Sequence, residues 1–436
     1  MITIDSVEVT LAHDGLLEGS VDAPATGCSV DGHVLRIVGW ALGSGSPLAH
    51  VEVGTDDGVL ARVALDRPRP DIQTAFGTNP HAHRCGFDVA LSLLGVPSAF
   101  TMWVVLTDRA GIRHHLASLS GRRSALELPA GAGPDPVMVT TLGRTGSTWL
   151  TQLLGAHPDV LALEPFRLEP RVVSYWAEVC SALSSPSSYL APLVSSEPES
   201  EDWWLGRGRA SGELGNSPEL EHWLATTHIT EVASFCRDRI EIFYRTAVKP
   251  PPGSGTPRYV VEKFNPTWVP NLVWELFPAA KEIFLVRDFR DRLASVIDFN
   301  RRRGYEAFGR ADFDSDEAFV REKVRIDAMT LLEAWRARRD RALLVRYEDM
   351  VLEPHETAAT ILEYLGLASD AGSVTSMIEG SRLPDEQTAP HRTTVDAAAS
   401  IGRWRHDLDG ALQRVCAEAL GEMLREFGYS TGERAS

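Results

Sequence analysis

The stretch VMVTTLGRTGSTWLTQLLGAHPD, residues 137–159, joins an apolar run to a helical pattern through a loop that contains two glycines. This is the layout of a phosphate-binding loop, because the unpaired amides at a helix N-terminus attract anions. The loop of nucleoside triphosphatases ends in Gly-Lys-Ser/Thr. Here the loop reads GRTGST over residues 143–148 and has no lysine. The stretch therefore predicts an anion site and leaves open which phosphate-bearing ligand such a loop takes.

Strand-like and helical segments alternate along the chain from Pro136 onward. The expected strands are 137–141, 160–163, 259–262, 282–286 and 342–345, and the expected helices are 147–156, 267–276, 290–302 and 355–365. This alternation predicts an α/β fold, a parallel sheet with helices on both faces. Ligands of such sheets bind at the carboxyl ends of the strands, where the loop lies.

The N-terminal part of the chain has a different pattern. Residues 1–125 contain short segments rich in β-branched and aromatic residues: HVLRIVGWAL, AHVEV, LARVAL, CGFDVALSL and FTMWVVLTD. Several such segments at near-regular spacing predict a small all-β sandwich. Residues 126–135 are rich in small residues, Gly and Pro and predict a linker, so the α/β domain is expected over residues 136–430.

The histidines of this part are candidates for a metal site: His81, His83, His114 and His115. They lie in turn-rich segments, where a histidine is more often solvated than bound to a metal. We therefore expect solvated side chains and no metal.

Composition narrows the class of protein. The chain has 436 residues, of which 44% are hydrophobic and 24% charged, as in soluble globular proteins. Its net charge of -17 argues against general affinity for nucleic acid or membrane, so an anion site must be a local group of arginines and lysines. Five scattered cysteines predict neither a zinc site nor a disulfide framework. The start, MITIDSVEVT, lacks the features of a signal peptide, and the expected compartment is the cytoplasm.

A second group of cations lies in KEIFLVRDFRDRLAS, residues 281–295. Arg287 ends the expected strand and Ser295 follows about two helical turns later, so both can contact one phosphate. The alternative is that the arginines pair with Asp288, Asp291 and Asp298 of the same helix. Asp288 is also placed like the magnesium-binding aspartate of an ATPase, but Arg287 stands directly after the strand and disfavours a cation there.

These motifs resemble those of the sulfotransferases that use 3′-phosphoadenosine 5′-phosphosulfate (PAPS). The loop is similar to the 5′-phosphosulfate loop of that family, and FLVRDFRDRLAS is similar to its 3′-phosphate segment. Two further similar segments are LLVRYEDMVLEP, residues 343–354, and SIGRWRHDL, residues 400–408. The resemblance covers residues 136–429 and does not extend to the N-terminal part. One departure is Phe289, where the family commonly has a proline.

The resemblance implies a site for PAPS and for the product adenosine 3′,5′-bisphosphate, without a metal. The residues implied to hold the 5′-phosphate and the sulfonate are Arg144, Thr145, Gly146, Ser147 and Thr148. Those implied to hold the rest of the nucleotide are Trp149 under the adenine, Arg287 and Ser295 at the 3′-phosphate, and Arg403 and Trp404 in the C-terminal segment.

Sulfonate transfer needs an in-line hydroxyl, neutralisation of the leaving oxygen and a base. Arg144 and Lys263 are the candidate cations, although Lys263 has an ion pair with Glu262 as its alternative. Glu164 ends the second expected strand and is the candidate base. The other candidates for the base are Glu169, His228 and His391, the histidines because cytosolic members of the family use a histidine.

The acceptor is expected to be a hydroxyl of a small molecule, glycan or natural product, because acceptor pockets are built from variable loops and the fold does not fix the substrate. The acidic segment 195–223 predicts a surface loop, and its Trp203 and Trp204 are a candidate acceptor surface. Two alternatives remain open. One is an ATP-dependent kinase of the P-loop class, which would require magnesium; the other is a non-catalytic nucleotide- or glycan-binding protein.

Overall fold

The structure is a computed structural model of the 436-residue chain. It describes residues 1–10, 16–43, 47–56, 58–129, 131–163, 171–184, 218–248, 255–267, 270–381, 393 and 396–431. The chain divides into two compact units. The first unit comprises Met1–Gly131, Tyr175–Arg239 and Val269–Pro278, and the second comprises Ala132–Ser174, Ile240–Trp268 and Ala279–Ser436.

The first unit contains two antiparallel sheets, with strand orders β3-β1-β9-β8-β5-β6 and β2-β4-β7. The strands are β1 Ile2–Val9, β2 Leu16–Ala23, β3 Ser29–Val30, β4 Val34–Gly43, β5 Leu48–Thr55, β6 Gly58–Ala64, β7 Gly86–Ser92, β8 Ala99–Asp108 and β9 Arg113–Arg123. Alternate residues of β4 and β8, such as Ile37 and Val104, are fully buried in one shared apolar cluster. This packing of two sheets over one core confirms the predicted all-β sandwich.

Helical segments complete the first unit. They are α1 Pro70–Ala75, η1 Ala82–Arg84, α5 Pro218–Trp223, η2 Leu224–His228 and α7 Asn271–Leu276. Two further helices, α3 Val172–Ser184 and α6 Ile229–Ala247, each contain a boundary between the units.

One histidine of the sandwich differs from the expectation. His114 is 6% exposed, and its Nε2 lies 3.8 Å from Oδ2 of Asp108, so it is a buried residue of β9. Within the described residues, no group of three or more His, Cys, Asp or Glu side chains is placed to hold a metal ion.

The second unit is built on a five-stranded sheet with the order β11-β12-β10-β13-β14, and every pair of neighbours is parallel. The strands are β10 Asp135–Thr141, β11 Val160–Leu161, β12 Tyr259–Phe264, β13 Lys281–Val286 and β14 Ala342–Arg346. Its helical segments are α2 Ser147–Gly155, α8 Phe289–Arg303, η3 Arg310–Asp312, α9 Asp316–Phe319, η4 Val320–Val324, α10 Arg325–Arg338, α11 Tyr347–Leu352, α12 Pro354–Leu365, α13 Ala371–Gly380, η6 Ala398–Ser400, α15 Trp404–Asp407 and α16 Gly410–Glu426.

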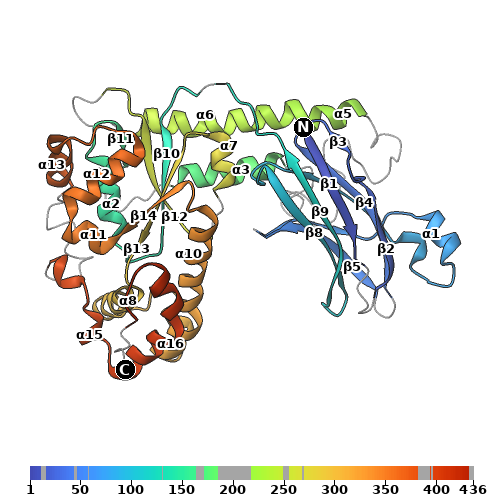
Figure 1. Cartoon of the computed structure of the whole chain (residues 1–436). Coiled ribbons are helices and arrows are strands. Elements are labelled where there is room, and N and C mark those ends of the chain that lie inside the picture. The colour runs from blue at the N-terminus through green and yellow to red at the C-terminus, as the bar shows by residue number, and fades with distance from the viewer. Residues whose placement is uncertain are drawn as a thin grey trace. The chain divides into compact units, whose positions relative to one another are not determined.

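Helices cover both faces of this sheet. Ile283 and Leu285 of β13 pack in a cluster with side chains of α2 and α12, whereas Phe284 and Val286 pack with α8, α10 and α16. Figure 1 shows α2 and α12 on one side of the sheet and α10 on the other. The α/β prediction is therefore confirmed.

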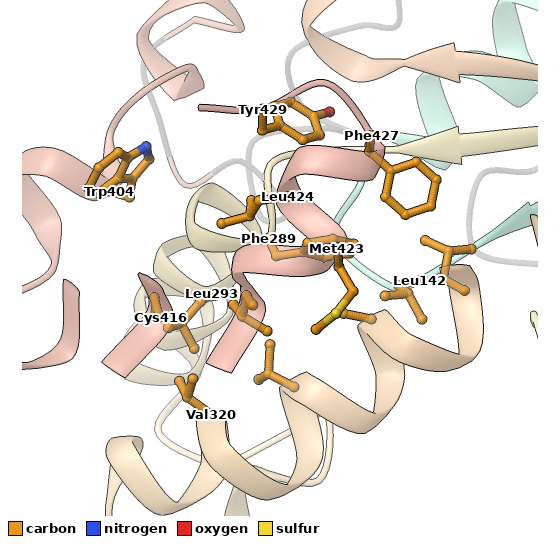
Figure 2. Close-up of a cluster of buried hydrophobic side chains, with 14 of the residues drawn as sticks. Leu142, Phe289, Leu293, Val320, Trp404, Cys416, Met423, Leu424, Phe427 and Tyr429 are labelled. Carbon is orange, nitrogen blue, oxygen red and sulfur yellow. The ribbon is translucent and has the colours of Figure 1, made fainter. Parts of the chain in front are cut away.

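The N-terminus of α8 is fixed by a buried aromatic residue. Phe289 is 1% exposed and meets Phe427 at a ring-centroid distance of 6.0 Å (Figure 2). Burial of such a side chain contributes about 1.5–3 kcal/mol. Phe289, at the position where the family commonly has a proline, is therefore a core residue. The helix is capped by Asp288, whose side chain accepts from the amide of Arg290 at 2.9 Å.

This topology brings two loops together. β10 and β13 are adjacent and parallel, with Thr141 paired to Leu285, so the segments that follow them leave the same edge of the sheet. Residues 142–146 and Arg287 begin at that edge. None of the helices in the described ranges is long and apolar enough to cross a membrane.

Candidate functional site

The loop after β10 is shaped by a glycine at the start of α2. Gly146 has a φ of +90°, and a Cβ atom there would lie 2.5 Å from Cδ2 of Tyr347. Any other residue would be strained by its backbone and blocked by this ring. Gly146 is the N-cap of α2 and has no side-chain oxygen to offer, so the first-turn amides are left without a side-chain cap. That arrangement is suited to an anion.

The side chain of Thr145 is buried and forms hydrogen bonds within the loop. Its side chain is 1% exposed, and its Oγ1 lies 2.5 Å from Oγ1 of Thr141 and donates to the carbonyl of Leu142 at 2.8 Å. The backbone amide is therefore what Thr145 can offer to an anion. Ser147 and Thr148 are only half-buried.

Lys263 reaches the same helix start from β12. Its Nζ donates to Oγ1 of Thr148 at 3.0 Å. Because Lys263 lies near the end of a strand parallel to β10, the sheet register itself places this ammonium at the first turn of α2. Glu262 points elsewhere and accepts from the amides of Val172 and Val173 at 3.0 Å and 3.1 Å.

Arg144 has a strained backbone that directs its side chain to α8. Its φ is +70°, a left-handed conformation that costs a residue other than glycine roughly 1–2 kcal/mol. Its Nε and Nη2 both lie 3.2 Å from Oγ of Ser295, and its guanidinium lies 4.7 Å from the ring centroid of Phe299. Strain of this kind is typical of functional positions.

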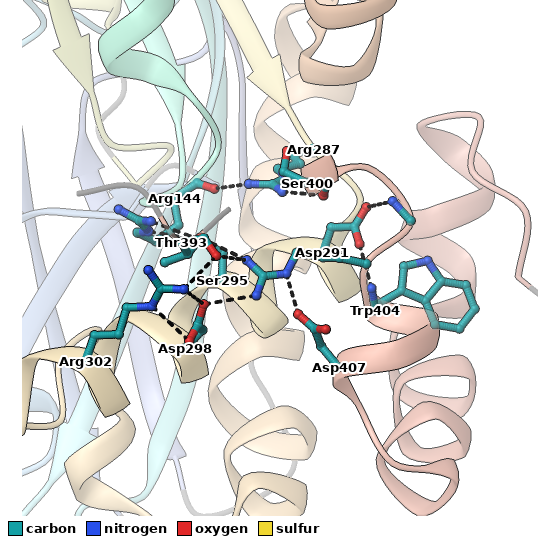
Figure 3. Close-up of polar contacts among 12 residues, drawn as sticks. Arg144, Arg287, Asp291, Ser295, Asp298, Arg302, Thr393, Ser400, Trp404 and Asp407 are labelled. Carbon is teal, nitrogen blue, oxygen red and sulfur yellow. Dashed lines mark hydrogen bonds and ion pairs between the residues drawn. The ribbon is translucent and has the colours of Figure 1, made fainter. Parts of the chain in front are cut away.

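Three guanidinium groups gather around Ser295, whose side chain is 1% exposed (Figure 3). Arg287 donates to the carbonyl oxygens of Arg144 at 3.2 Å and Ser400 at 2.8 Å. Arg403 donates to Oγ1 of Thr393 at 2.9 Å, and that hydroxyl lies 3.2 Å from Oγ of Ser295.

The electrostatics of this group favour a bound anion. Burial, and then the charges of Arg287 and Arg403, lower the pKa of Arg144 to about 10. Like charges held this close repel one another, and a phosphate beside Arg144 and Arg287 would relieve the repulsion. Arg403 is already paired with Asp298 at 3.1 Å and with Asp407 at 2.5 Å. The acidic chain thus contains the local basic group that an anion site requires.

The three aspartates at the N-cap and in the body of α8 have different kinds of partners. Asp288 pairs with Arg290 at 2.7 Å, and Asp298 accepts from Arg403 at 3.1 Å as well as from Arg302. Asp291 accepts from backbone amides of the C-terminal segment. Asp288 and Asp298 thus pair with arginines and Asp291 does not, and Arg287 takes part in none of the ion pairs among the described residues. The partners of Asp288 also weaken its candidacy as a magnesium ligand, because its carboxylate already caps α8 and binds Arg290.

A sequence model described as "Sulfotransferase family" matches residues 136–371. The chain belongs to this family. The predicted resemblance is thereby confirmed over residues 136–371, which include Arg144, Arg287 and Ser295 but not Arg403.

Two curated relatives of the chain are named as sulfotransferases. "Carbohydrate sulfotransferase 1" of Danio rerio is 32% identical over 158 residues, 33% of this chain and 37% of that protein. "Protein-tyrosine sulfotransferase" of Drosophila melanogaster is 25% identical over 232 residues, 52% of this chain and 37% of that protein. The chain thus spans about a third of the length of these relatives.

Solved structures similar to the chain are sulfotransferases as well. The mouse sulfotransferase SULT7A1 complexed with PAP has a TM-score of 0.37 and 12% identity, over 68% of this chain and 86% of that chain. The sulfotransferase domain from the curacin biosynthetic pathway has a TM-score of 0.37 and 14% identity, over 65% and 97%.

Two tryptophans of the sulfotransferase unit lie in different environments. Trp149 is half-buried, donates from Nε1 to Oγ of Ser381 at 3.3 Å, and meets the edge of Tyr347 at 6.5 Å. Trp404 is 8% exposed and has Arg290 4.0 Å from its ring centroid. Figure 3 shows its indole directed away from Ser295. Adenine stacking stays a prediction for Trp149, and Trp404 contributes to the apolar core.

Of the candidate bases, His228 alone lies in the part of the chain that the structure describes. Glu164, Glu169 and His391 lie outside the described residues, as do Trp203 and Trp204. His228 is described, and its Nε2 lies 3.1 Å from the carbonyl oxygen of Leu183. The identity of the base therefore stays a prediction.

Tyr347, Thr393 and Ser400 contact the site, and the sequence analysis gave them no role. Tyr347 lies 4.5 Å from the guanidinium of Arg287, and its hydroxyl lies 2.9 Å from Oγ of Ser400. Its position directly after β14, at the same sheet edge as the loop, was the available signal. Ser400 begins the quoted segment SIGRWRHDL. Thr393 has no such signal, because its contact with Ser295 arises only when the C-terminal segment folds back onto α8.

Proposed function

We propose that this protein is a PAPS-dependent sulfotransferase that transfers a sulfonate group to an acceptor hydroxyl. The observation that carries the proposal is the gathering of Arg144, Arg287 and Arg403 around Ser295, beside the uncapped start of α2. These are two neighbouring anion sites, one of amides and one of guanidinium groups. They suit a nucleotide with a phosphosulfate at one end of its ribose and a phosphate at the other.

In the proposed reaction, the acceptor oxygen attacks the sulfur in line and the bond from sulfur to the bridging oxygen breaks. Negative charge then grows on the 5′-phosphate that leaves. The ammonium of Lys263, 3.0 Å from Thr148 Oγ1, and the first-turn amides of α2 are placed to neutralise it. Preorganised donors of this kind stabilise the charge that develops in the transition state. The acceptor proton passes to a base, for which we propose Glu164.

The acceptor class is proposed from chemistry and relatives. Any nucleophilic hydroxyl meets the needs of the reaction, and the names of the relatives cover carbohydrate and tyrosine acceptors. We propose a carbohydrate hydroxyl first, with small-molecule hydroxyls and tyrosine peptides as comparison classes.

Transfer of labelled sulfonate tests the proposal. The full chain is incubated with ³⁵S-labelled PAPS and, in separate reactions, oligosaccharides, tyrosine peptides and small phenols. We expect label in at least one acceptor class and the same rate after magnesium is chelated with EDTA. Turnover of ATP that requires magnesium would favour the kinase. Tight binding of the bisphosphate without transfer to any class would favour a non-catalytic binding protein.

Replacement of Glu164 tests the base. Glu164→Gln keeps size and hydrogen bonding but cannot take the proton, so turnover should fall by about 10²–10⁴-fold. Affinity for the bisphosphate should change little, because the variant alters no cation. The matched controls Glu169→Gln and His391→Ala should have smaller effects. Near-normal turnover of Glu164→Gln would move the base to one of these residues.

We also propose that the protein works in the cytoplasm. All five cysteines are free thiols, which is usual in reducing compartments. Fractionation of the source cells with an antibody to the chain would test this, and recovery from a secreted or lumenal fraction would contradict it.

A further inference from the structure

Asp291 holds the backbone on both sides of Arg403. Its carboxylate is 1% exposed; Oδ2 accepts from the amide of Gly402 at 2.7 Å, and Oδ1 accepts from the amide of Trp404 at 2.9 Å (Figure 3). Arg403 is the residue between these two donors. A buried carboxylate is costly unless its oxygens are satisfied, and here each oxygen has a backbone partner.

One face of α8 forms the surface against which the C-terminal segment docks. Asp291, Ser295 and Asp298 are spaced i, i+4 and i+7, so they lie on one side of the helix. Each contacts a different part of the segment: Asp291 the backbone beside Arg403, Ser295 the hydroxyl of Thr393 at 3.2 Å, and Asp298 the guanidinium of Arg403 at 3.1 Å.

The geometry of Gly402 explains how a single carboxylate reaches both amides. Its φ is +74°, a left-handed turn that directs the two N–H groups to the same side, and a Cβ atom there would lie 2.6 Å from Nη1 of Arg405. The segment is fixed again two residues earlier, where Arg287 donates to the carbonyl of Ser400 at 2.8 Å. Asp291 therefore determines where the Arg403 backbone lies relative to Ser295.

We propose that Asp291 is a positioning residue that sets the preference for a nucleotide with a 3′-phosphate, by placing Arg403 beside Ser295. The inference rests on the proposed function of the same site. Asp291 has both oxygens occupied by the protein and acts through Arg403 alone. Its loss should therefore weaken only those ligands that carry the group Arg403 binds.

Calorimetric titration of adenosine 3′,5′-bisphosphate and of AMP into the full chain tests this. For Asp291→Asn we expect affinity for the bisphosphate to fall roughly 10-fold or more, as expected when a charge-assisted contact is lost, while affinity for AMP changes less than about two-fold. The KM for PAPS should rise by a similar factor with kcat retained. Asp370→Asn is the matched control, because Asp370 also accepts from two backbone amides, Gly372 and Ser373, and lies outside this segment.

A double-mutant cycle separates positioning from general stabilisation. In an Arg403→Ala background, Asp291→Asn should cause no further loss of bisphosphate affinity, because the residue through which it acts is gone. Gly402→Ala disturbs the same contact from the other partner, and it should reproduce the selective loss even where Asp291→Asn folds poorly.

The outcomes are distinguishable. If the parent protein shows no preference for the bisphosphate over AMP, the proposed function fails. If the parent has this preference and both Asp291→Asn and Gly402→Ala keep it, the positioning role is wrong. Equal loss of AMP and bisphosphate affinity, or additive losses in the cycle, would also overturn it, because each would indicate a structural role only.

Discussion

Arg287 leaves β13 with its guanidinium between two carbonyl oxygens and the face of Tyr347. Carbonyl oxygens and an aromatic ring fix its direction without neutralising its charge. Its side chain is buried, with the residue 5% exposed, so the charge has lost most of its water. A cation in this state gains more from an anion than a solvated one does.

The first prediction concerns Arg287→Ala. Affinity for adenosine 3′,5′-bisphosphate should fall by about 10–100-fold, because a charge-assisted contact is worth about 1.5–3 kcal/mol. AMP should bind the variant as it binds the parent. Calorimetry measures both, and Arg287→Lys serves as the control that keeps the charge but not the planar fork. Equal losses of affinity for the two ligands would show that Arg287 does not bind the 3′-phosphate.

The second prediction concerns Trp149. Stacking on a base is worth roughly 1–3 kcal/mol, so Trp149→Ala should weaken nucleotide binding by at least several-fold. Trp149→Phe keeps an aromatic face and loses only the bond to Ser381, so it should bind nearly as the parent does. Titration with the bisphosphate distinguishes the two variants. If both bind as the parent does, the indole is core packing against Tyr347.

At the scale of elements, strands that are buried on both faces were the easiest to predict from the sequence. β10 and β13 are buried on both faces and read as continuous apolar runs, so their predicted limits differ from the observed ones by at most two residues. β9 was not predicted, because its sequence RHHLASLSGRR is polar although His114, Leu116 and Arg123 are buried. The helices α10 and α16 were missed as well, although the buried residues of α16, such as Leu412, Val415 and Cys416, recur at helical spacing.

The residues of the candidate site also fall into those that the sequence predicts and those that it does not. Residues in the loops after strands, such as Arg144 and Arg287, were predicted, because the parallel sheet brings strand ends to one edge. Contacts such as Ser295 with Thr393 join positions 98 residues apart, and no local pattern encodes them. Predicting them requires knowledge of how the C-terminal segment docks on α8.

The third prediction concerns β12, through Glu262. Its carboxylate is 2% exposed and accepts from the amide of Val173 at the start of α3 and from the hydroxyl of Tyr244. Burial raises the pKa of Glu262 to about 7, although these hydrogen bonds oppose the rise. The folded state thus binds the proton more tightly than the unfolded state does. This contribution to stability is full below about pH 4.5 and is lost as the pH rises through about 7.

Glu262→Gln has no proton to lose. The free energy of unfolding of the variant, minus that of the parent, should therefore increase by on the order of 3 kcal/mol between about pH 5 and pH 8. Urea unfolding at a series of pH values measures the difference. Glu356→Gln, at an exposed position of α12, is the matched control for the loss of a carboxylate. A constant difference for Glu262→Gln would show that its carboxylate does not titrate in this range.

At the scale of the whole chain, the first unit contains segments that are far apart in sequence. Arg123, at the end of the sandwich, forms a buried ion pair with Glu275 of α7. The same carboxylate accepts from the amide of Leu126 at 3.0 Å, and Arg36 of β4 pairs with Glu221 of α5 at 3.0 Å. The domain boundary between residues 125 and 126 stays a prediction. These contacts determine how much stability is lost when the chain is shortened near that boundary.

The last prediction is that a chain shortened to begin at Ala132 loses stability. In the full chain the side chain of Glu275 is 8% exposed, so Arg123→Ala would leave its carboxylate buried without a cation. Breaking a buried pair from one side typically costs about 3–5 kcal/mol. Urea unfolding of Arg123→Ala should show this loss, and the shortened chain, which loses the same ion pair, should be less stable than the parent as well.

The control variant removes both charges of the Arg123–Glu275 pair, so it does not restore their contact. Arg123→Ala combined with Glu275→Gln should recover part of the stability, because no unpaired charge is then left buried. Every residue proposed for the chemistry follows residue 131, so turnover per folded molecule should be retained in the shortened chain. A shortened chain that is as stable as the parent would show that the sandwich is independent of α5 and α7. A folded one without turnover would show instead that the sandwich is needed for the reaction itself.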